Sequence, residues 1–266
     1  MNYFDLLDDW TILSIAQSYP LSQYLLVGFR ATCRRMRQLI SCPEKIDADK
    51  LMIMSAKIGS IEGITLAQKM GAEDCDGMIY CAAQYGHREI CEIMHKTTND
   101  RLECMLRGAA EGGHRELCEL ARKWGAYDFN EMLLSAATGG HREICKLARE
   151  WSARDFDGMM SSAATGGHRE ICKLARKWGA RNFDSMISCA AASGHRKICK
   201  LARKWGAHDF EAMLDAAAWG GHREICEIAR EWGARDFHWM SMFALENKHY
   251  ELCELADKWQ AETHSE

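Results

Sequence analysis

The sequence predicts an all-α protein, built mainly as a helical solenoid of about eight helix–turn–helix repeats. Three observations support this fold class. The chain repeats itself with a period of 27 residues, its apolar positions follow helical spacing, and only two prolines, Pro20 and Pro43, occur among 266 residues. A fixed period of this size is typical of stacked repeats, in which each unit buries its apolar face against its neighbours.

The composition argues against nucleic-acid and membrane partners. The 34 basic and 38 acidic residues give a net charge of -4, and this balance produces no overall basic field, so we expect no nucleic-acid partner. No apolar run reaches the ~18 residues that a membrane span needs. Asp5, Asp8 and Asp9 stand where a signal peptide would carry basic residues. We therefore expect a cytoplasmic protein with no membrane partner.

Residues 1–43 do not repeat and read as short helices, broken near Pro20. The segments "TILSI", "SYPLSQYLL" and "ATCRRMRQLIS" follow one another in the order that an F-box shows, so residues 1–43 resemble that family. Leu7 stands where the family has proline, and Met36 stands at its aromatic position. An alternative is a three-helix cap over the open end of the solenoid, and both interpretations can hold together.

The F-box resemblance implies that this segment docks to a Skp-type adaptor of a cullin–RING ubiquitin ligase. The positions that match the family's adaptor contacts are Leu6, Leu7, Ile12, Leu13, Pro20, Leu21, Leu25 and Leu26.

Residues 44–266 carry the repeat. Columns of histidine, cysteine, methionine and tryptophan recur at the same step, and an alanine pair recurs with them. The histidines that mark the units are His87, His114, His141, His168, His195, His222 and His249. Ser60 stands one step earlier, in a divergent first copy.

Each unit reads as two short helices, as the copy over residues 153–179 illustrates. Asp155 or Asp157 can cap the first helix, and a glycine pair at 166–167 ends it. The second helix is expected to begin near His168 and to end at Gly179. Helices of about ten residues are unstable alone, so the array must fold cooperatively.

The segment "AATGGHREICKLARKWGA" resembles the ankyrin repeat in its alanine pair, its Gly-His turn, the following Glu and the final Gly-Ala. The period is 27 residues rather than about 33, and the missing residues fall where the ankyrin family places a β-hairpin. The repeats are therefore ankyrin-like with clipped hairpins, and they are similar to arrays encoded by large DNA viruses. For a viral protein this implies the host-cell cytoplasm.

The His and Cys of "HREIC" share one helix face, a spacing that could supply two metal ligands. The favoured interpretation is structural, because the same pair recurs in seven units: Cys fills the core and His orders the turn. Neighbouring helices lie too far apart for disulfides between equivalent cysteines. The recurring tryptophans are expected at the edge of the core. We expect no metal, no cofactor and no catalytic residue.

Two columns of the first helix vary while their neighbours stay fixed, and they lie four residues apart on one face. In the ankyrin family this face lines a concave binding surface, so the resemblance implies a protein target there. A variable column at the clipped tips, which includes Arg154 and Arg181, would flank it. The alternative is surface drift with no partner. The candidate target-binding residues are Tyr80, Gln84, Arg107, Glu111, Leu134, Asp215, Trp219 and Met242.

Together, the two resemblances predict a non-enzymatic substrate receptor that links a target protein to a Skp–cullin-type ubiquitin ligase. The alternative is a plain repeat scaffold in which residues 1–43 only cap the solenoid. The two hypotheses differ in whether that segment binds an adaptor.

Overall fold

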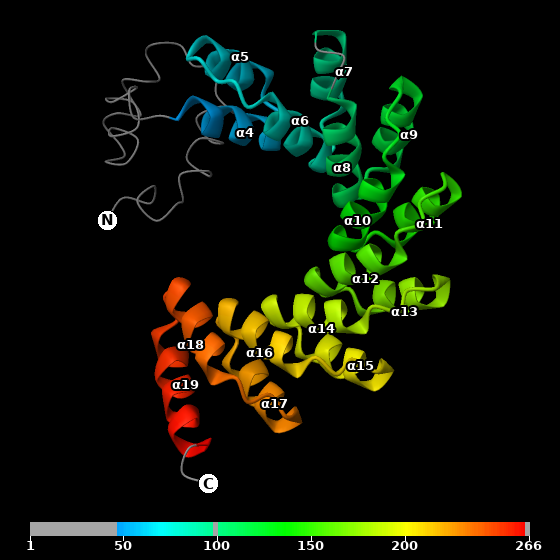
Figure 1. The fold of residues 1–266 in the computed structure, drawn as a ribbon. Coiled ribbons are helices and arrows are strands. Elements are labelled where there is room, and N and C mark those ends of the chain that lie inside the picture. Colours follow the sequence, from blue (N-terminus) through cyan, green and yellow to red (C-terminus); the bar gives the residue numbers. More distant parts are fainter. Residues whose placement is uncertain (1–46, 98–100, 264–266) are drawn as a thin grey trace, which may run out of the picture. The chain divides into compact units, whose positions relative to one another are not determined.

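The computed structural model describes residues 47–97 and 101–263 (Figure 1). These residues form helices joined by turns, and the described ranges contain no strand. The chain divides into two compact units, Met1–Tyr127 and Asp128–Glu266. This division falls inside the predicted repeat array, whereas the predicted boundary after residue 43 lies outside the described residues.

The described part of the first unit consists of three helix pairs. The pairs are α4 (Ala48–Ile58) with α5 (Ile61–Lys69), α6 (Cys75–Gln84) with α7 (Arg88–Thr97), and α8 (Leu102–Gly112) with α9 (Arg115–Trp124). The first helices pack in chain order, α4 against α6 and α6 against α8.

Five further pairs form the described part of the second unit. They are α10 (Phe129–Gly139) with α11 (Arg142–Glu150), α12 (Phe156–Thr165) with α13 (Arg169–Trp178), α14 (Phe183–Ala192) with α15 (Arg196–Trp205), α16 (Phe210–Trp219) with α17 (Arg223–Trp232), and α18 (Phe237–Glu246) with α19 (Tyr250–Thr263). The first helices α10, α12, α14, α16 and α18 lie side by side in this order (Figure 1). The predicted helix–turn–helix repeat is confirmed.

Side-chain caps begin the described first helices, with the exception of α8. Asp155 accepts the backbone N–H of Gly158 at 2.8 Å, so of the two acids offered by the sequence it is the cap. Asp157 instead reaches the next repeat, where it accepts the backbone N–H groups of Arg181 at 2.6 Å and Asn182 at 2.8 Å. The same bridge joins other neighbouring repeats through Asp49, Asn130, Asp184 and Glu211.

The recurring methionine, alanine and cysteine columns form the core. Met159, Ala163 and Cys172 are fully buried, and Ile171 is nearly so. The small alanines allow the helix pairs to approach closely, while methionine fills the remaining space. The apolar stripe of each helix is buried against its own pair and the adjacent repeats, so the units depend on one another for stability.

The recurring histidine joins successive repeats. His168 Nε2 donates to the carbonyl oxygen of Thr138 in the preceding repeat at 2.9 Å. The ring also covers Gly140, where a Cβ would lie 2.5 Å from His168 Cε1. The same bond is made by His87, His114, His195 and His222 to Lys57, Gln84, Thr165 and Ala192. Histidine therefore orders the turn, as predicted, by bonding to the preceding repeat.

The tryptophans form a second ladder at the ends of the second helices. The rings of Trp178 and Phe156 meet edge to face with centroids 5.5 Å apart. The guanidinium of Arg149, from the preceding second helix, lies 4.7 Å from the Trp178 ring centroid. Equivalent Arg–Trp contacts join Arg176 to Trp205, Arg203 to Trp232 and Arg230 to Trp259. The tryptophan column thus packs at the edge of the core.

Candidate protein-binding surface

In each unit, we use the term first-helix face for the variable surface of its first helices, and each unit carries four of the eight candidate target-binding residues. In the first unit, Tyr80 and Gln84 lie on α6, and Arg107 and Glu111 lie on α8. Tyr80 Oη donates to the Glu111 carboxylate, and Gln84 Nε2 donates to its other oxygen at 3.1 Å. Burial, together with Glu111, raises the pKa of Tyr80, so the phenol remains a donor at neutral pH.

Three of these first-unit residues are therefore joined in one half-buried polar cluster, while Arg107 is exposed beside it. A cluster whose donors and acceptors are paired internally offers few unsatisfied groups to a partner. Arg107 is the most exposed of these four side chains.

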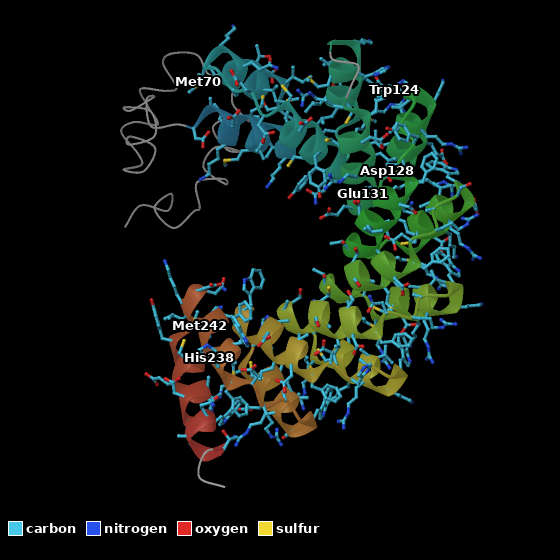
Figure 2. All side chains as sticks on the ribbon, in the orientation of Figure 1. Met70, Trp124, Asp128, Glu131, His238 and Met242 are labelled. Atoms are coloured by element: carbon cyan, nitrogen blue, oxygen red, sulfur yellow. The ribbon has the colours of Figure 1, made fainter. Side chains whose placement is uncertain are left out.

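In the second unit, Leu134 lies on α10, Asp215 and Trp219 lie on α16, and Met242 lies on α18. Leu134 and Asp215 are half-buried, whereas Trp219 and Met242 are 54% and 41% exposed. Figure 2 labels Met242 on α18. Since α10, α12, α14, α16 and α18 pack in sequence, the variable columns run across one face of this unit.

Large apolar side chains, Trp219, Trp239 and Met242 among them, are exposed on α16 and α18, the last two first helices of this unit. Sequence reasoning missed one of these three, Trp239, which is 50% exposed. It precedes Met242 by three residues and therefore shares its side of α18. The signal was present in the sequence, because Trp239 stands outside the tryptophan column that contains Trp232 and Trp259. Exposed tryptophans are common anchors at protein interfaces.

Asp215 lies on this same face, four residues before Trp219. Its Oδ1 is buried and has no hydrogen-bond partner among the described residues. Burial, and then the charges of Asp236, Glu211 and Asp209, raise the pKa of Asp215 to about 6. The face therefore combines exposed aromatic rings with a poorly solvated carboxylate.

Replacing Asp215 by asparagine is expected to stabilise the protein at pH 8 by about 1 kcal/mol, after a discount for partial solvent exposure. Because the pKa of the folded state is raised, the folded protein binds this proton more tightly than the unfolded chain does. The benefit of the protonated form is complete below pH ~4 and is lost as the pH rises through about 6. Thermal unfolding of both proteins at pH 4 and at pH 8 checks this prediction. The stability gain of the asparagine variant should appear at pH 8 only, and an equal gain at pH 4 would contradict the prediction.

The recurring His and Cys residues have structural partners. Burial raises the pKa of the Cys172 thiol to about 12, and the same holds for Cys91, Cys118, Cys145, Cys199 and Cys226. Such thiols stay neutral, and the described cysteines are free of disulfides. In residues 47–97 and 101–263 no cluster of three or more His, Cys, Asp or Glu side chains could hold a metal ion.

Two further predictions concern the variable column at the tips and the adaptor-binding residues. Arg154 and Arg181 at the tips turn back to the second helices, where their Nη1 atoms donate to the carbonyl oxygens of Arg149 and Arg176. The eight candidate adaptor-binding residues lie outside the described residues.

Comparison with known proteins gives no relative: no family model matches the chain, and no curated protein is significantly similar to it. In the part of the chain that the structure describes, no helix combines the length and the apolar character needed to cross a membrane.

Proposed function

We propose that the chain is a non-enzymatic protein-interaction module of ankyrin-like repeats, which acts as the substrate receptor of a Skp–cullin-type ubiquitin ligase. The observation that carries the binding role is the exposed group formed by Trp219, Trp239 and Met242 on the first-helix face. Three large apolar side chains left exposed on neighbouring helices of one unit are typical of a protein interface.

The ligase link is supported by the F-box-like sequence of residues 1–43. In this role the chain makes and breaks no bond. It holds a target near the ubiquitin carrier of the ligase and so raises the effective concentration of the target. The repeat array supplies one binding surface and the N-terminal segment supplies the other.

Titration calorimetry of the full chain with a purified Skp-type adaptor tests the ligase link. We expect binding by the intact chain, and loss of binding when residues 1–43 are deleted or when Leu13 is replaced by aspartate. Circular dichroism melting must show the repeat array still folded in both variants. Absence of binding by the intact, folded chain would contradict the receptor role and leave a scaffold whose N-terminal segment only caps the array.

A further inference from the structure

The second helices α13 and α15 carry a concentrated positive charge in a chain whose net charge is -4. Helix α15 contains five basic residues and no acidic one. In α13, four basic residues accompany a single acid, Glu170. The other described second helices each have an acid in the first turn, whereas α15 has Lys197 at that position.

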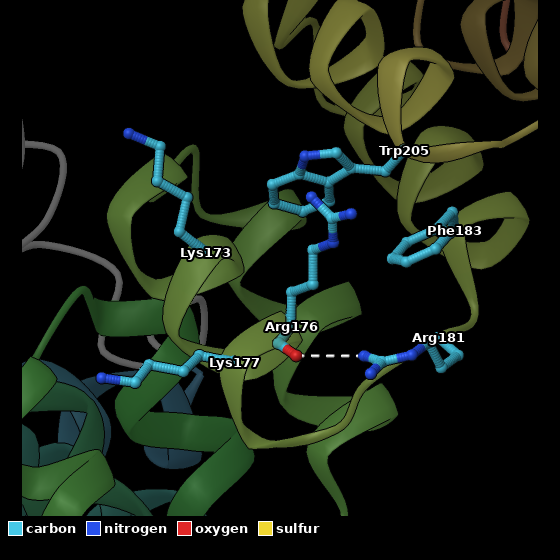
Figure 3. A pocket seen from close by; sticks show the side chains of 6 residues that line it. All are labelled: Lys173, Arg176, Lys177, Arg181, Phe183 and Trp205. Carbon is cyan, nitrogen blue, oxygen red and sulfur yellow. Dashed lines mark hydrogen bonds between the residues drawn. The ribbon is translucent and has the colours of Figure 1, made fainter.

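A cleft of about 490 Å³ lies between these two helices (Figure 3), and we call it the basic cleft. Its lining includes four cationic side chains, two aromatic rings and no carboxylate: Lys173, Arg176, Lys177, Arg181, Phe183 and Trp205. The guanidinium of Arg176 lies 4.6 Å from the Trp205 ring centroid, and Arg181 Nη1 donates to the Arg176 carbonyl oxygen at 3.0 Å. These contacts fix the arginines of the cleft before any ligand arrives.

Equivalent clefts in neighbouring repeats show which part of this arrangement is structural. The preceding cleft, of about 360 Å³, keeps the arginine–tryptophan contact but has Glu150 where the basic cleft has Lys177. Two repeats after the basic cleft, Glu231 stands at the position of Lys177. Arg230 beside it is paired with Glu262 at 2.7 Å. Stacking requires the arginine and the rings. It does not require the lysines, so their accumulation on α13 and α15 needs another explanation.

The lysines of this face are largely unneutralised. Lys173 pairs with the exposed Glu170 at 2.6 Å. Across the described residues, no ion-pair partner is found for Lys177, Lys200 or Lys204. Lys200 lacks the partner that Lys173 has, because Lys197 replaces the glutamate three residues before it. Arg196 of α15 pairs with Glu224 at 3.3 Å, but no such counter-charge is found among the described residues for these three lysines, and an anionic ligand would relieve the repulsion among them.

We propose that the basic cleft and the adjoining face of α15 bind an acidic peptide segment of a partner protein. Single-stranded nucleic acid is disfavoured, because its bases need exposed aromatic faces to stack on. The Trp205 ring already carries Arg176 on its face and Phe183 at its side. The groups that remain available are ammonium and guanidinium donors, which match carboxylates.

Repeat geometry sets the spacing of the acidic residues in this segment. Packed helices lie about 8–10 Å apart, and an extended peptide rises about 3.3 Å per residue. Acidic side chains about three residues apart therefore reach successive clefts. This surface lies on the second helices and is separate from the first-helix face, so it binds its peptide whether or not the first-helix face holds a target.

Fluorescence anisotropy of the full chain with a labelled (Glu-Ser-Gly)4 peptide at 50 mM salt tests the proposal. We expect saturable binding that weakens steeply at 500 mM salt, and none with the matched (Gln-Ser-Gly)4 peptide. The double variant Lys177→Glu/Lys204→Glu is expected to weaken binding about tenfold or more. Folding should be retained, because the chain itself has Glu150 and Glu231 at the equivalent positions.

Lys123→Glu is the matched control, since Lys123 occupies the same repeat position on α9 of the other unit. It should change the affinity less than twofold, whereas Glu150→Lys, which extends the basic face, should strengthen binding. Equal weakening by Lys123→Glu and the double variant, no binding by the folded chain, or tighter binding of an oligouridine probe at the same lysines would each overturn the proposal.

Discussion

Replacing Gly167 by alanine is expected to lower the free energy of unfolding by about 2–4 kcal/mol. Gly167 has φ +81°, a left-handed conformation that costs any residue with a Cβ. The new Cβ would also lie 2.8 Å from Cε1 of His195, whose ring belongs to the next repeat. The added methyl group therefore lowers stability both through backbone strain and through its close contact with the His195 ring. Urea unfolding followed by circular dichroism measures the loss.

Lys248 provides the matched control for this prediction. It occupies the same repeat position as Gly167 and has φ +62°, but no further repeat follows it in the described array, and so no histidine ring covers it. Lys248→Ala should change the stability by no more than about 0.5 kcal/mol, because a Cβ is already present there. A comparable loss in both variants, or an unchanged Gly167→Ala protein, would show that the histidine contact between repeats is not what selects glycine.

Replacing both Trp219 and Trp239 by alanine is expected to weaken binding of the target protein at least about 30-fold. The two rings are 54% and 50% exposed, so their removal creates no cavity in the core. The midpoint of thermal unfolding should therefore stay within about 2 °C of the unchanged chain. Biolayer interferometry measures the affinity of the unchanged chain and of the double variant for the same target protein, and a melting curve of each checks that it is folded.

Tyr250→Ala is the control for this double variant. Tyr250 is 61% exposed, but it begins the second helix α19 and lies off the first-helix face. Its loss should leave target affinity unchanged. If the double tryptophan variant unfolds, the rings belong to the core. If it stays folded and keeps its affinity, the target binds elsewhere.

The repeat itself was predictable from sequence because each unit contains the same local signals. The apolar stripe around Ala163 and the terminating Gly179 act within a single helix pair, so spacing alone places them. The same holds for buried Cys172, whose recurrence in every full copy favoured a core role over a metal site.

Contacts between repeats were less accessible to sequence reasoning. Asp155 and Asp157 are equivalent as candidate caps, and only the fold shows that Asp157 reaches the backbone of the following tip. Trp239 lies beside the two variable columns, so variation along those columns does not mark it as exposed. The basic face of α13 and α15 was hidden by the near-neutral composition of the whole chain.

Co-precipitation of a Skp-type adaptor and a target protein through one full-length chain tests the proposed receptor with two binding surfaces. We expect both proteins to be retained. Deletion of residues 1–43 should release the adaptor and keep the target, while Trp219→Ala/Trp239→Ala should release the target and keep the adaptor. Retention of the target alone by the unchanged, folded chain, or loss of both proteins in either folded variant, would contradict a receptor with two separate binding surfaces.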